Sequence, residues 1–410
     1  MKTFEKTPAI VLGSHKIGLG IIRALGSMNI PVIAVYYNKM DMGHKSKHVI
    51  DYYNCPNPES DEDGFINCLI SIADKWKGSV LIPSDDITLY PVSKNKDLLS
   101  KYFRVAANDF NIIHIAVDKK YTYNLAHKLG IPAPKTLTPI SLEEAISFTE
   151  KIGYPAILKP SVSHTFFELF GKKMIFVRNK EELEKAYRAT ENANIEMMIQ
   201  EFIPGDDTHG INYNSFMING NSVAEFTAEK VRLSPRGTGF PVVIKSKYIH
   251  SVSNYGRTIL RELGYEGYSN IEFKKDARDG TYKIMDINAR QNLSTPLSVK
   301  CGFNFPYMSY LFVLKGYVGK TESKFNENIY WIDPAKDLGE VIRNFKKEKF
   351  SLVNFIKPYL MPKVFTIQSI KDPKPLFNRI FNVLKSLRKI VLKNDPIAKK
   401  GKNLYQMNLS

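Results

Sequence analysis

The sequence predicts a mixed α/β and α+β protein, and two patterns carry that prediction. Residues 9–36 read as an apolar run, a helical segment and a second apolar run, which is the strand–helix–strand opening of a parallel α/β sheet. Residues 269–273 and 282–290 alternate apolar and polar side chains, and the turn dipeptide Asp279-Gly280 lies between them, as in an antiparallel hairpin. We therefore expect an N-terminal parallel α/β domain, a mixed region that contains the hairpin, and a helical C-terminal extension.

Length and charge limit the classes of protein that fit. A chain of 410 residues should form two or three compact domains. The net charge of +17 favours anionic partners, namely nucleotides, acidic metabolites, an anionic membrane surface or nucleic acid. Charge alone does not choose among these partners.

The cysteines and the apolar runs bear on location. Cys55, Cys68 and Cys301 show neither a paired nor a metal-ligand spacing, which predicts a reducing compartment and no disulfide. The N-terminus has no apolar core of the signal-peptide type, and no run approaches the roughly 18 apolar residues of a membrane span. We therefore expect a cytoplasmic protein.

The N-terminal segment offers two possible ligand turns. Gly13, Gly18 and Gly20 do not fit the dinucleotide spacing G-x-G-x-x-G, and no acidic residue ends the second strand, so we reject NAD binding. A further strand over 79–83 is followed by Ser-Asp-Asp at 84–86, where open α/β sheets bind ligands. The alternative is a helix N-cap, because Ser and Asp are favoured there.

Two lysines in the middle of the chain lie at the ends of expected secondary-structure elements. Asp118-Lys119 opens a helical stretch that Gly130 closes. After a Pro-rich connector and a helix that opens at Ser141 in the manner of a capping box, an apolar strand ends in Lys159. Such a lysine is ordinarily solvated at a strand end, but it is also a suitable phosphate ligand.

A strand over 197–203 runs into a Pro-Gly turn followed by two acids, Asp206 and Asp207. Proline frees backbone groups from regular pairing, and free backbone groups in an apolar crease suit an adenine edge. Asp207 is a suitable acceptor for ribose hydroxyls, although a plain hairpin turn explains the same pattern. Further on, Lys230, Arg232 and Arg236 form a basic cluster that suits a polyphosphate or, as the alternative, a solvated loop.

The hairpin is the strongest chemical signal. Asp286, Asn288 and Arg290 are two residues apart and share one face of their strand, as Asn270 and Glu272 do on the other. Two carboxylates and an amide oxygen are hard ligands that suit Mg²⁺, and an arginine beside them would bind phosphate or a developing oxyanion. The alternative is a surface hairpin with scattered charges.

Taken together, these motifs resemble the ATP-grasp superfamily of carboxylate–amine ligases over about residues 105–305, and within it D-aspartate ligase-like members. The closest likeness lies in residues 199–207, 278–283 and 286–291. The resemblance implies three domains: a pre-ATP-grasp domain over 1–117, a two-subdomain ATP-grasp fold over 118–316 (subdomains about 118–203 and 204–316) and a C-terminal extension over 317–410.

The resemblance also implies roles for single residues. Lys119 and Lys159 would be the two nucleotide lysines. Adenine would be bound by Gln200, Glu201 and the Ile203 backbone, and ribose by Asp207. Mg²⁺, with Mn²⁺ as the alternative, would be bound by Glu272, Asp286 and Asn288. Arg290 would be the arginine of the reactive centre. Two departures from the family pattern stand out: residues 161–165 lack the glycines of the usual phosphate flap, and some relatives have Asp in place of Glu272.

The implied reaction is amide formation. ATP would phosphorylate a substrate carboxylate to an acyl phosphate, and an amine would then displace phosphate. Lys230 and Arg232 would hold the γ-phosphate or the carboxylate, and Arg290 the oxyanion. The expected substrates are small-molecule carboxylates and amines, either amino acids or cell-wall or glycan precursors, and a homodimer is compatible with the family.

The C-terminal residues form a basic amphipathic pattern. Over 371–403 there are ten Lys or Arg and two Asp, a net charge of about +8. Apolar residues recur at helical spacing, as Leu376, Ile380, Val383, Leu384, Leu387, Ile390 and Val391. Such a helix either packs on the body with a solvated basic face or lies on an anionic membrane, which would place the protein at the inner membrane face.

Two other classes of function compete with the ligase. A non-catalytic ATP sensor would keep Lys159 and the adenine segment but would need neither Glu272 nor Asp286. A nucleic-acid binder would explain the charge, but the sequence carries no recognition motif, so we expect no nucleic-acid partner.

Overall fold

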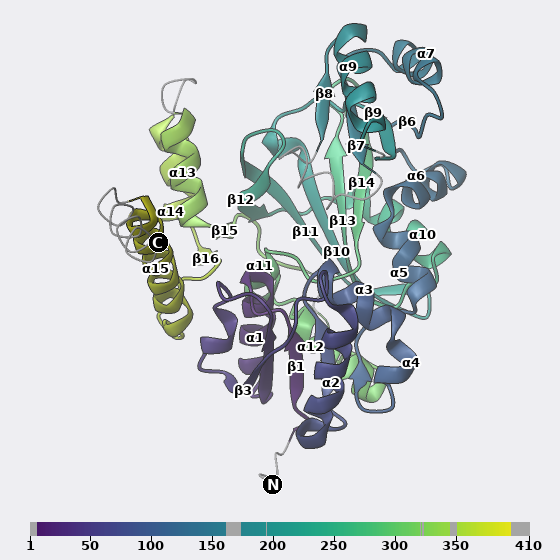
Figure 1. Cartoon of the computed structure of the whole chain (residues 1–410). Helices are drawn as coiled ribbons and strands as arrows, with labels where there is room; N and C mark the ends of the chain where they lie inside the picture. The colour runs from purple at the N-terminus through teal and green to yellow at the C-terminus, as the bar shows by residue number, and fades with distance from the viewer. Residues whose placement is uncertain are drawn as a thin grey trace, which may run out of the picture. The chain divides into compact units, whose positions relative to one another are not determined.

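A computed structural model describes residues 6–160, 174–193, 195–319, 321, 324–344 and 351–394. The chain divides into two compact units (Figure 1). The first comprises the chain up to Ala106, Val313–Gly316 and the chain from Phe365 onward, and the second comprises Ala107–Phe312 and Tyr317–Val364. The predicted division into three domains stays a prediction.

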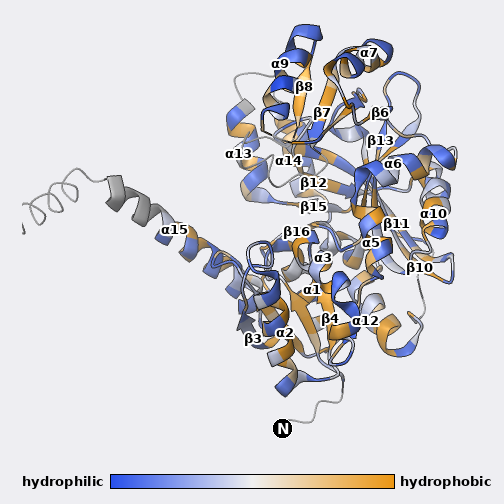
Figure 2. Cartoon of the chain, turned by 45° about the vertical axis from the view of Figure 1, so that its right-hand side comes forward, coloured by the Kyte–Doolittle hydropathy of each residue, from blue (hydrophilic) through white to orange (hydrophobic). Residues whose placement is uncertain are grey.

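The first unit is built on a parallel sheet with the strand order β3-β2-β1-β4-β5. The buried apolar side chains of β1, β2 and β4 form its core, and the neighbourhood of β4 is apolar in Figure 2. Its elements are β1 (Ala9–Leu12), α1 (Lys16–Gly26), β2 (Val32–Tyr36), η1 (Gly43–Lys45), β3 (Val49–Asn54), α2 (Glu62–Trp76), β4 (Val80–Pro83), α3 (Asp86–Lys94), α4 (Lys96–Leu99), β5 (Arg104–Val105) and α15 (Lys374–Asn394). The predicted N-terminal parallel α/β sheet is confirmed.

The polar residues that follow β4 cap a helix. The Asp85 carboxylate accepts hydrogen bonds from the Thr88 amide and hydroxyl, which is the N-cap that the sequence left as an alternative. The same carboxylate accepts from the Tyr37 hydroxyl at 2.5 Å and pairs with His15 Nε2 at 2.7 Å. Burial raises the pKa of Asp85, but these partners outweigh it and lower the pKa to about 2.

The cysteine prediction is wrong. Cys55, directly after β3, and Cys68, in α2, form a disulfide, while Cys301 is a buried free thiol. A separation of 13 residues is not a diagnostic cysteine spacing, so no local pattern indicated the bond. The cysteines therefore no longer support a reducing compartment.

The predicted C-terminal helix is confirmed as α15. The Asp372 carboxylate, just before it, accepts hydrogen bonds from Arg23, Ser46 and the Lys47 amide, and Leu376 packs against a small apolar cluster of the same unit. The predicted apolar positions Leu387, Ile390 and Val391 lie outside the side chains that the structure describes. Within the described part of the chain, no helix is both long enough and apolar enough to cross a membrane.

The second unit contains two sheets. The large sheet has the strand order β14-β13-β10-β11-β12-β15-β16, and the small sheet β6-β9-β7-β8. The elements are α5 (Phe110–Val117), α6 (Lys119–Lys128), β6 (Thr136–Leu137), α7 (Leu142–Ile152), β7 (Ala156–Pro160), β8 (Ile175–Val177), α9 (Lys180–Glu191), β9 (Met197–Glu201), η2 (Asp207–His209), β10 (Gly210–Ile218), β11 (Asn221–Ser234), β12 (Phe240–Ser246), η3 (His250–Val252), α10 (Ser253–Glu262), β13 (Gly267–Lys275), β14 (Tyr282–Asn288), α11 (Thr295–Lys300), α12 (Phe305–Lys315), β15 (Tyr330–Ile332), α13 (Pro334–Asn344), α14 (Leu352–Leu360) and β16 (Lys363–Phe365). The strand expected near Tyr330 is present as β15, although β16 follows it.

The small sheet has one apolar and one polar face. Leu158 and Ile199 pack in a core with residues of α7 and α9. Because side chains alternate along a strand, Lys159 and Gln200 lie on the opposite face. Helices α6 and α7 begin as predicted, because the Asp118 side chain caps α6 and the Ser141 side chain caps α7. The predicted flap positions 161–165 lie outside the described residues.

Candidate active site

The antiparallel hairpin of β13 and β14 places the predicted ligands on one face. Glu272 lies directly opposite Asp286, and Asn270 lies directly opposite Asn288. Directly opposed residues carry their side chains on the same face with Cβ atoms about 5 Å apart. The geometry that the alternation predicted is therefore present, and the turn at Gly280 adopts the positive φ of +76° that glycine permits.

Each carboxylate of the hairpin pairs with a lysine from another element. Lys119 Nζ, at the start of α6, lies 2.9 Å from Asp286 Oδ1, and Lys230 Nζ, in β11, lies 2.5 Å from Glu272 Oε2. Burial raises the pKa of Glu272, but the Lys230 ammonium more than offsets it and holds the pKa below its usual range. Each acid of the hairpin thus has a lysine ammonium as its partner.

Lys159 on β7 faces the same group of charges. Burial and the nearby Lys119 ammonium lower the pKa of Lys159 to about 8, against the attraction of Asp286 and Glu272. Three lysines therefore surround two carboxylates, which leaves a local excess of positive charge in a partly desolvated place. Such a surplus suits a polyphosphate.

The carboxamide of Gln200 is a second candidate ligand group. Its side chain is fully buried on β9, and neither atom of its carboxamide has a hydrogen-bond partner of ordinary geometry among the described residues. Burying an unsatisfied amide costs about 1–3 kcal/mol, so a further hydrogen-bond partner is expected here. A nucleobase edge offers both a donor and an acceptor, which is what a carboxamide requires.

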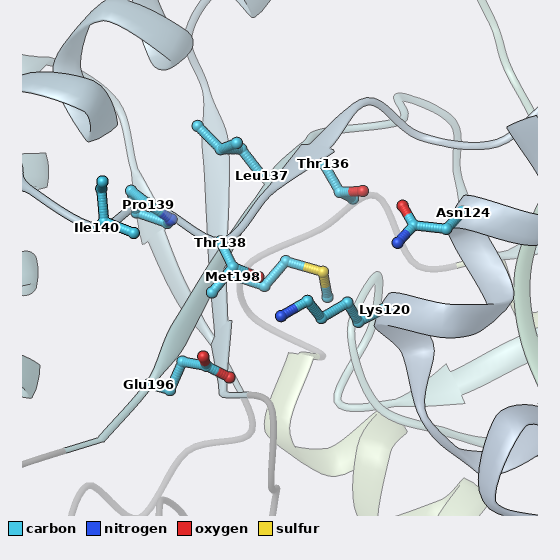
Figure 3. Close-up of a pocket in the computed structure, with 9 residues that line it drawn as sticks. All are labelled: Lys120, Asn124, Thr136, Leu137, Thr138, Pro139, Ile140, Glu196 and Met198. Atoms are coloured by element: carbon cyan, nitrogen blue, oxygen red, sulfur yellow. The ribbon is translucent and has the colours of Figure 1, made fainter.

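A pocket of about 320 Å³ adjoins this face of the small sheet (Figure 3). Thr136 and Met198, which line it, are the strand neighbours of Gln200 and Lys159. Its other lining residues are Lys120, Asn124, Leu137, Thr138, Pro139, Ile140 and Glu196. Figure 3 shows the Lys120 ammonium extending from α6 across the pocket toward the strand that carries Met198.

The side chain of Glu201 is occupied. Its carboxylate pairs with Arg278 at 2.5 Å and with Lys283 at 3.2 Å, and it accepts a hydrogen bond from the Lys135 amide. These bonds tie the small sheet to the β13–β14 hairpin. A contact of Glu201 with adenine stays a prediction, as does that of the backbone of the buried Ile203.

Asp207 is likewise engaged. Its two carboxylate oxygens accept hydrogen bonds from the Leu233 amide at 2.9 Å and the Gly237 amide at 2.8 Å. Asp207 thus holds the β11–β12 connection. A carboxylate can accept further bonds, so a contact with ribose stays a prediction.

The structure argues against the role predicted for Arg232. Its guanidinium forms a two-point ion pair with Asp337, at 2.7 and 2.8 Å, and donates to the Asn354 carbonyl. The pairing register of β11 with β12 shifts between Lys230 and Arg232 and again after Arg232, so regular alternation does not hold between these two residues. Lys230 reaches Glu272 and Arg232 does not.

Asn288 and Arg290 complete the group. Asn288 Nδ2 donates to Asn270 Oδ1 at 3.3 Å and lies 3.5 Å from Glu272 Oε1. Arg290 is half-buried beyond the end of β14, and its charge also lowers the pKa of Glu272. Among the described residues, no three His, Cys, Asp or Glu side chains gather as a metal cluster, so the candidate donor set is two carboxylates and an amide oxygen. Its chemistry fits Mg²⁺.

Sequence reasoning missed the asparagines of β10. Asn212 pairs with Glu272 and Asn214 pairs with Asn270, so both lie on the face of the candidate site. Asn212 is 4% exposed, and its Oδ1 has no hydrogen-bond partner among the described residues. The signal was the alternation of two amides in a mostly apolar strand.

Two family models match the chain. A RimK-like ATP-grasp domain matches residues 116–232, and the ATP-binding domain of the carbamoyl-phosphate synthase L chain matches residues 242–307. Together these segments include the lysines and the hairpin described above.

One curated relative resembles most of the chain. The D-aspartate ligase of Enterococcus faecium is 26% identical over 322 residues, which cover 73% of this chain and 75% of the relative. Carbamoyl phosphate synthase large chains also match, for example that of Myxococcus xanthus at 25% identity, but the match spans only 19% of its length.

Solved structures show the same fold. Biotin carboxylase from Campylobacter jejuni has a TM-score of 0.63 at 17% identity, and covers 79% of this chain and 74% of its own. An L-amino acid ligase from Bacillus licheniformis has a TM-score of 0.58 at 17% identity, with 76% and 75% covered. At these identities the likeness concerns the fold alone.

Proposed function

The chain carries an ATP-grasp domain and its homologues are ATP-grasp ligases, and from this premise we propose that it is an ATP-dependent carboxylate–amine ligase that works through an acyl phosphate. The observation that carries the proposal is the pair of ion pairs, Lys119–Asp286 and Lys230–Glu272, with Lys159 facing both acids. A sensor would bind ATP without needing two acids beside three lysines.

The proposed chemistry has two steps. A substrate carboxylate oxygen attacks the γ-phosphorus of ATP, the bond to the bridging oxygen breaks, and ADP leaves. An amine nitrogen then attacks the acyl carbon, loses a proton, and expels inorganic phosphate. Lys119, Lys159 and Lys230 would hold and neutralise the phosphates, and Arg290 would stabilise the oxyanion of the second step.

Glu272, Asp286 and Asn288 would hold Mg²⁺, which supplies charge neutralisation at the phosphates when bound. The buried carboxamide of Gln200 would meet the adenine edge. We propose an amino acid as the activated carboxylate, on the strength of the 26% identity with D-aspartate ligase. D-Aspartate is the first carboxylate to test.

The direct test is an ADP-release screen with pairs of amino acids and amine acceptors, including peptides and cell-wall precursors. We expect ADP release only when both a carboxylate and an amine are present, and Asp286→Ala should abolish it. Inclusion of hydroxylamine would convert an acyl phosphate to a hydroxamate, which identifies the intermediate. Nucleotide binding without turnover across the whole screen would favour the sensor instead.

We also propose that α15 contacts an anionic membrane surface. Its apolar side chains Phe377, Phe381 and Leu384, at helical spacing, are 65%, 64% and 59% exposed. Residues 374–394 contain six Lys or Arg and no acid. An exposed apolar stripe with basic flanks suits the interface of an anionic bilayer.

Co-sedimentation with vesicles tests that contact. We expect binding to phosphatidylglycerol vesicles but not to phosphatidylcholine vesicles, and loss of binding in the Phe377→Ser/Phe381→Ser double variant. Ile370→Ser is the matched control, because Ile370 is fully exposed but precedes the helix. Equal sedimentation of both variants would remove the membrane from the proposal.

A further inference from the structure

A chain of buried asparagines runs from the core of the second unit to the candidate metal site. Asn214, Asn270 and Asn288 are 2%, 1% and 7% exposed and lie on neighbouring strands of the large sheet. Their amides bond to one another in series: Asn270 Nδ2 to Asn214 Oδ1 at 3.3 Å, and Asn288 Nδ2 to Asn270 Oδ1 at 3.3 Å.

The hydrogen bonds of this asparagine series run in one direction. Asn214 Nδ2 donates to the Phe226 carbonyl at 3.1 Å, and a backbone carbonyl can only accept. Asn214 Oδ1 must therefore point the other way, toward Asn270, and it accepts from Asn270 Nδ2. Asn270 Oδ1 then points toward Asn288 and accepts from Asn288 Nδ2. Each amide donates backward and accepts from the next. The Nδ2 of Asn288 therefore donates to Asn270 Oδ1 and lies 3.5 Å from Glu272 Oε1, and its Oδ1 is turned to the opposite side.

A second anchor holds the segment that follows β14. Asn292 Oδ1 accepts from the Ser294 amide at 2.9 Å, and a backbone N–H can only donate. Asn292 Nδ2 is thereby aimed at Asn214 Oδ1, 2.9 Å away, and the Tyr268 hydroxyl donates to the same oxygen at 2.7 Å. Asn214 thus fixes both Asn288 and Asn292, and Arg290 lies midway between them in sequence.

We propose that Asn214 and Asn270 are positioning residues that set the orientation of the Asn288 amide, so that its carbonyl oxygen rather than its NH₂ group faces the metal. An amide that rotates by half a turn would present donors to a cation, which repels it. The inference rests on the proposed function, because it assumes that Asn288 is a metal ligand. Partners behind a metal ligand typically change metal affinity by about 10–100-fold when they are removed.

The test uses Mn²⁺ binding to the full chain, in the presence of a non-hydrolysable ATP analogue and detected by electron paramagnetic resonance. Asn270→Leu removes the amide and keeps the size of the side chain. We expect its Mn²⁺ affinity to fall at least about tenfold. Ser269→Ala is the matched control, because it removes a buried hydrogen bond to Ser215 from the other face of the same strand, and it should bind as the unmodified chain does.

Rescue separates positioning from general damage. A carboxylate has no donor end, so Asn288→Asp needs no orientation by Asn270. In the Asn270→Leu background, Asn288→Asp should restore the Mn²⁺ affinity to within about threefold of that of the unmodified chain. Beside an intact Asn270, the same change places two acceptor oxygens against each other and should weaken Mn²⁺ binding. Thermal melting verifies the fold, and Asn270→Ala replaces Asn270→Leu if the latter does not fold.

The outcomes distinguish this inference from the proposed function. If Asn270→Leu binds Mn²⁺ normally, or if the double variant shows no recovery, the orienting chain is overturned while the ligase proposal stands. If Asp286→Ala also binds Mn²⁺ normally, the hairpin is not the metal site, and both proposals fall.

Discussion

Lys119 Nζ lies 2.9 Å from Asp286 Oδ1, although 167 residues separate the two in sequence. Both side chains are 30% exposed, so the ion pair itself should contribute at most about 1 kcal/mol to stability. A variant of Asp286 should therefore test the proposed role in binding with little effect on the stability of the fold.

The first prediction concerns Asp286→Asn. We expect ADP release to fall at least about 100-fold, because the variant loses an ionised ligand and leaves Lys119 without its counter-charge, while the free energy of unfolding changes by about 1 kcal/mol or less. Coupled ADP assays and urea denaturation measure the two quantities. Glu62→Gln is the matched control, since it removes a surface ion pair with Lys94 in the other unit and should change neither.

The second prediction concerns pH. Lys159 has a pKa of about 8, and only its protonated form attracts phosphate. Bound ATP should raise this pKa, so ATP affinity should be constant well below pH 8 and fall by up to about tenfold per pH unit above it. Titration calorimetry between pH 6.5 and 9.5 measures this. Lys159→Arg stays charged, so a decline of the same steepness in that variant would assign the effect to another group.

The third prediction concerns Arg232. Arg232→Met leaves the fully buried Asp337 without its cation, and the free energy of unfolding should fall by about 3–5 kcal/mol. The KM for ATP of the folded enzyme should not change. Adding Asp337→Asn should recover much of the lost stability. A large rise in KM without loss of stability would restore the catalytic role that the sequence predicted.

The fourth prediction concerns Gln200. Because its carboxamide has no partner of ordinary geometry among the described residues, Gln200→Leu should leave the melting temperature unchanged or raise it. ATP affinity should fall about tenfold, while the preference for ATP over GTP should weaken. Competition binding with both nucleotides measures this, and unchanged selectivity would place adenine elsewhere.

The fifth prediction concerns the disulfide. A bond that closes a loop of 13 residues should contribute about 3 kcal/mol in the chain-entropy account. We expect reduction, or the Cys55→Ser/Cys68→Ser variant, to lower the unfolding free energy of the first unit by about that amount. Cys301→Ser is the control for thiol loss. Identical denaturation curves with and without reductant would show that the bond contributes no stability.

The elements that local pattern determines were predictable. Period-two alternation placed Glu272 and Asp286 on one face, and capping residues placed the start of α6, because both signals lie within a few residues of their effects. Contacts between segments far apart in the sequence produce no local sequence pattern and could not be predicted. The bond from Cys55 to Cys68 and the pairing of Arg232 with Asp337 depend on tertiary packing, and no local spacing encodes them.

The amide face of the site lies between these cases. The alternation of Asn212 and Asn214 is visible in the sequence, but the register that places them beside Glu272 and Asn270 follows only from strand pairing. The functional assignment came from the combined order of the motifs, since none of them taken alone separates a ligand site from an ordinary turn or strand end.

The register shifts in β11 affect how related chains should be compared. Lys230 pairs with Glu272 and Arg232 pairs with Asp337, because the register shift between them turns the two side chains to different faces of the strand. A homologue that lacks the irregularity would carry both residues on one face of the strand, although its sequence would align without a gap at these positions. Residue roles should therefore be assigned in such homologues from the strand residue that each position pairs with, and not from the sequence alignment alone.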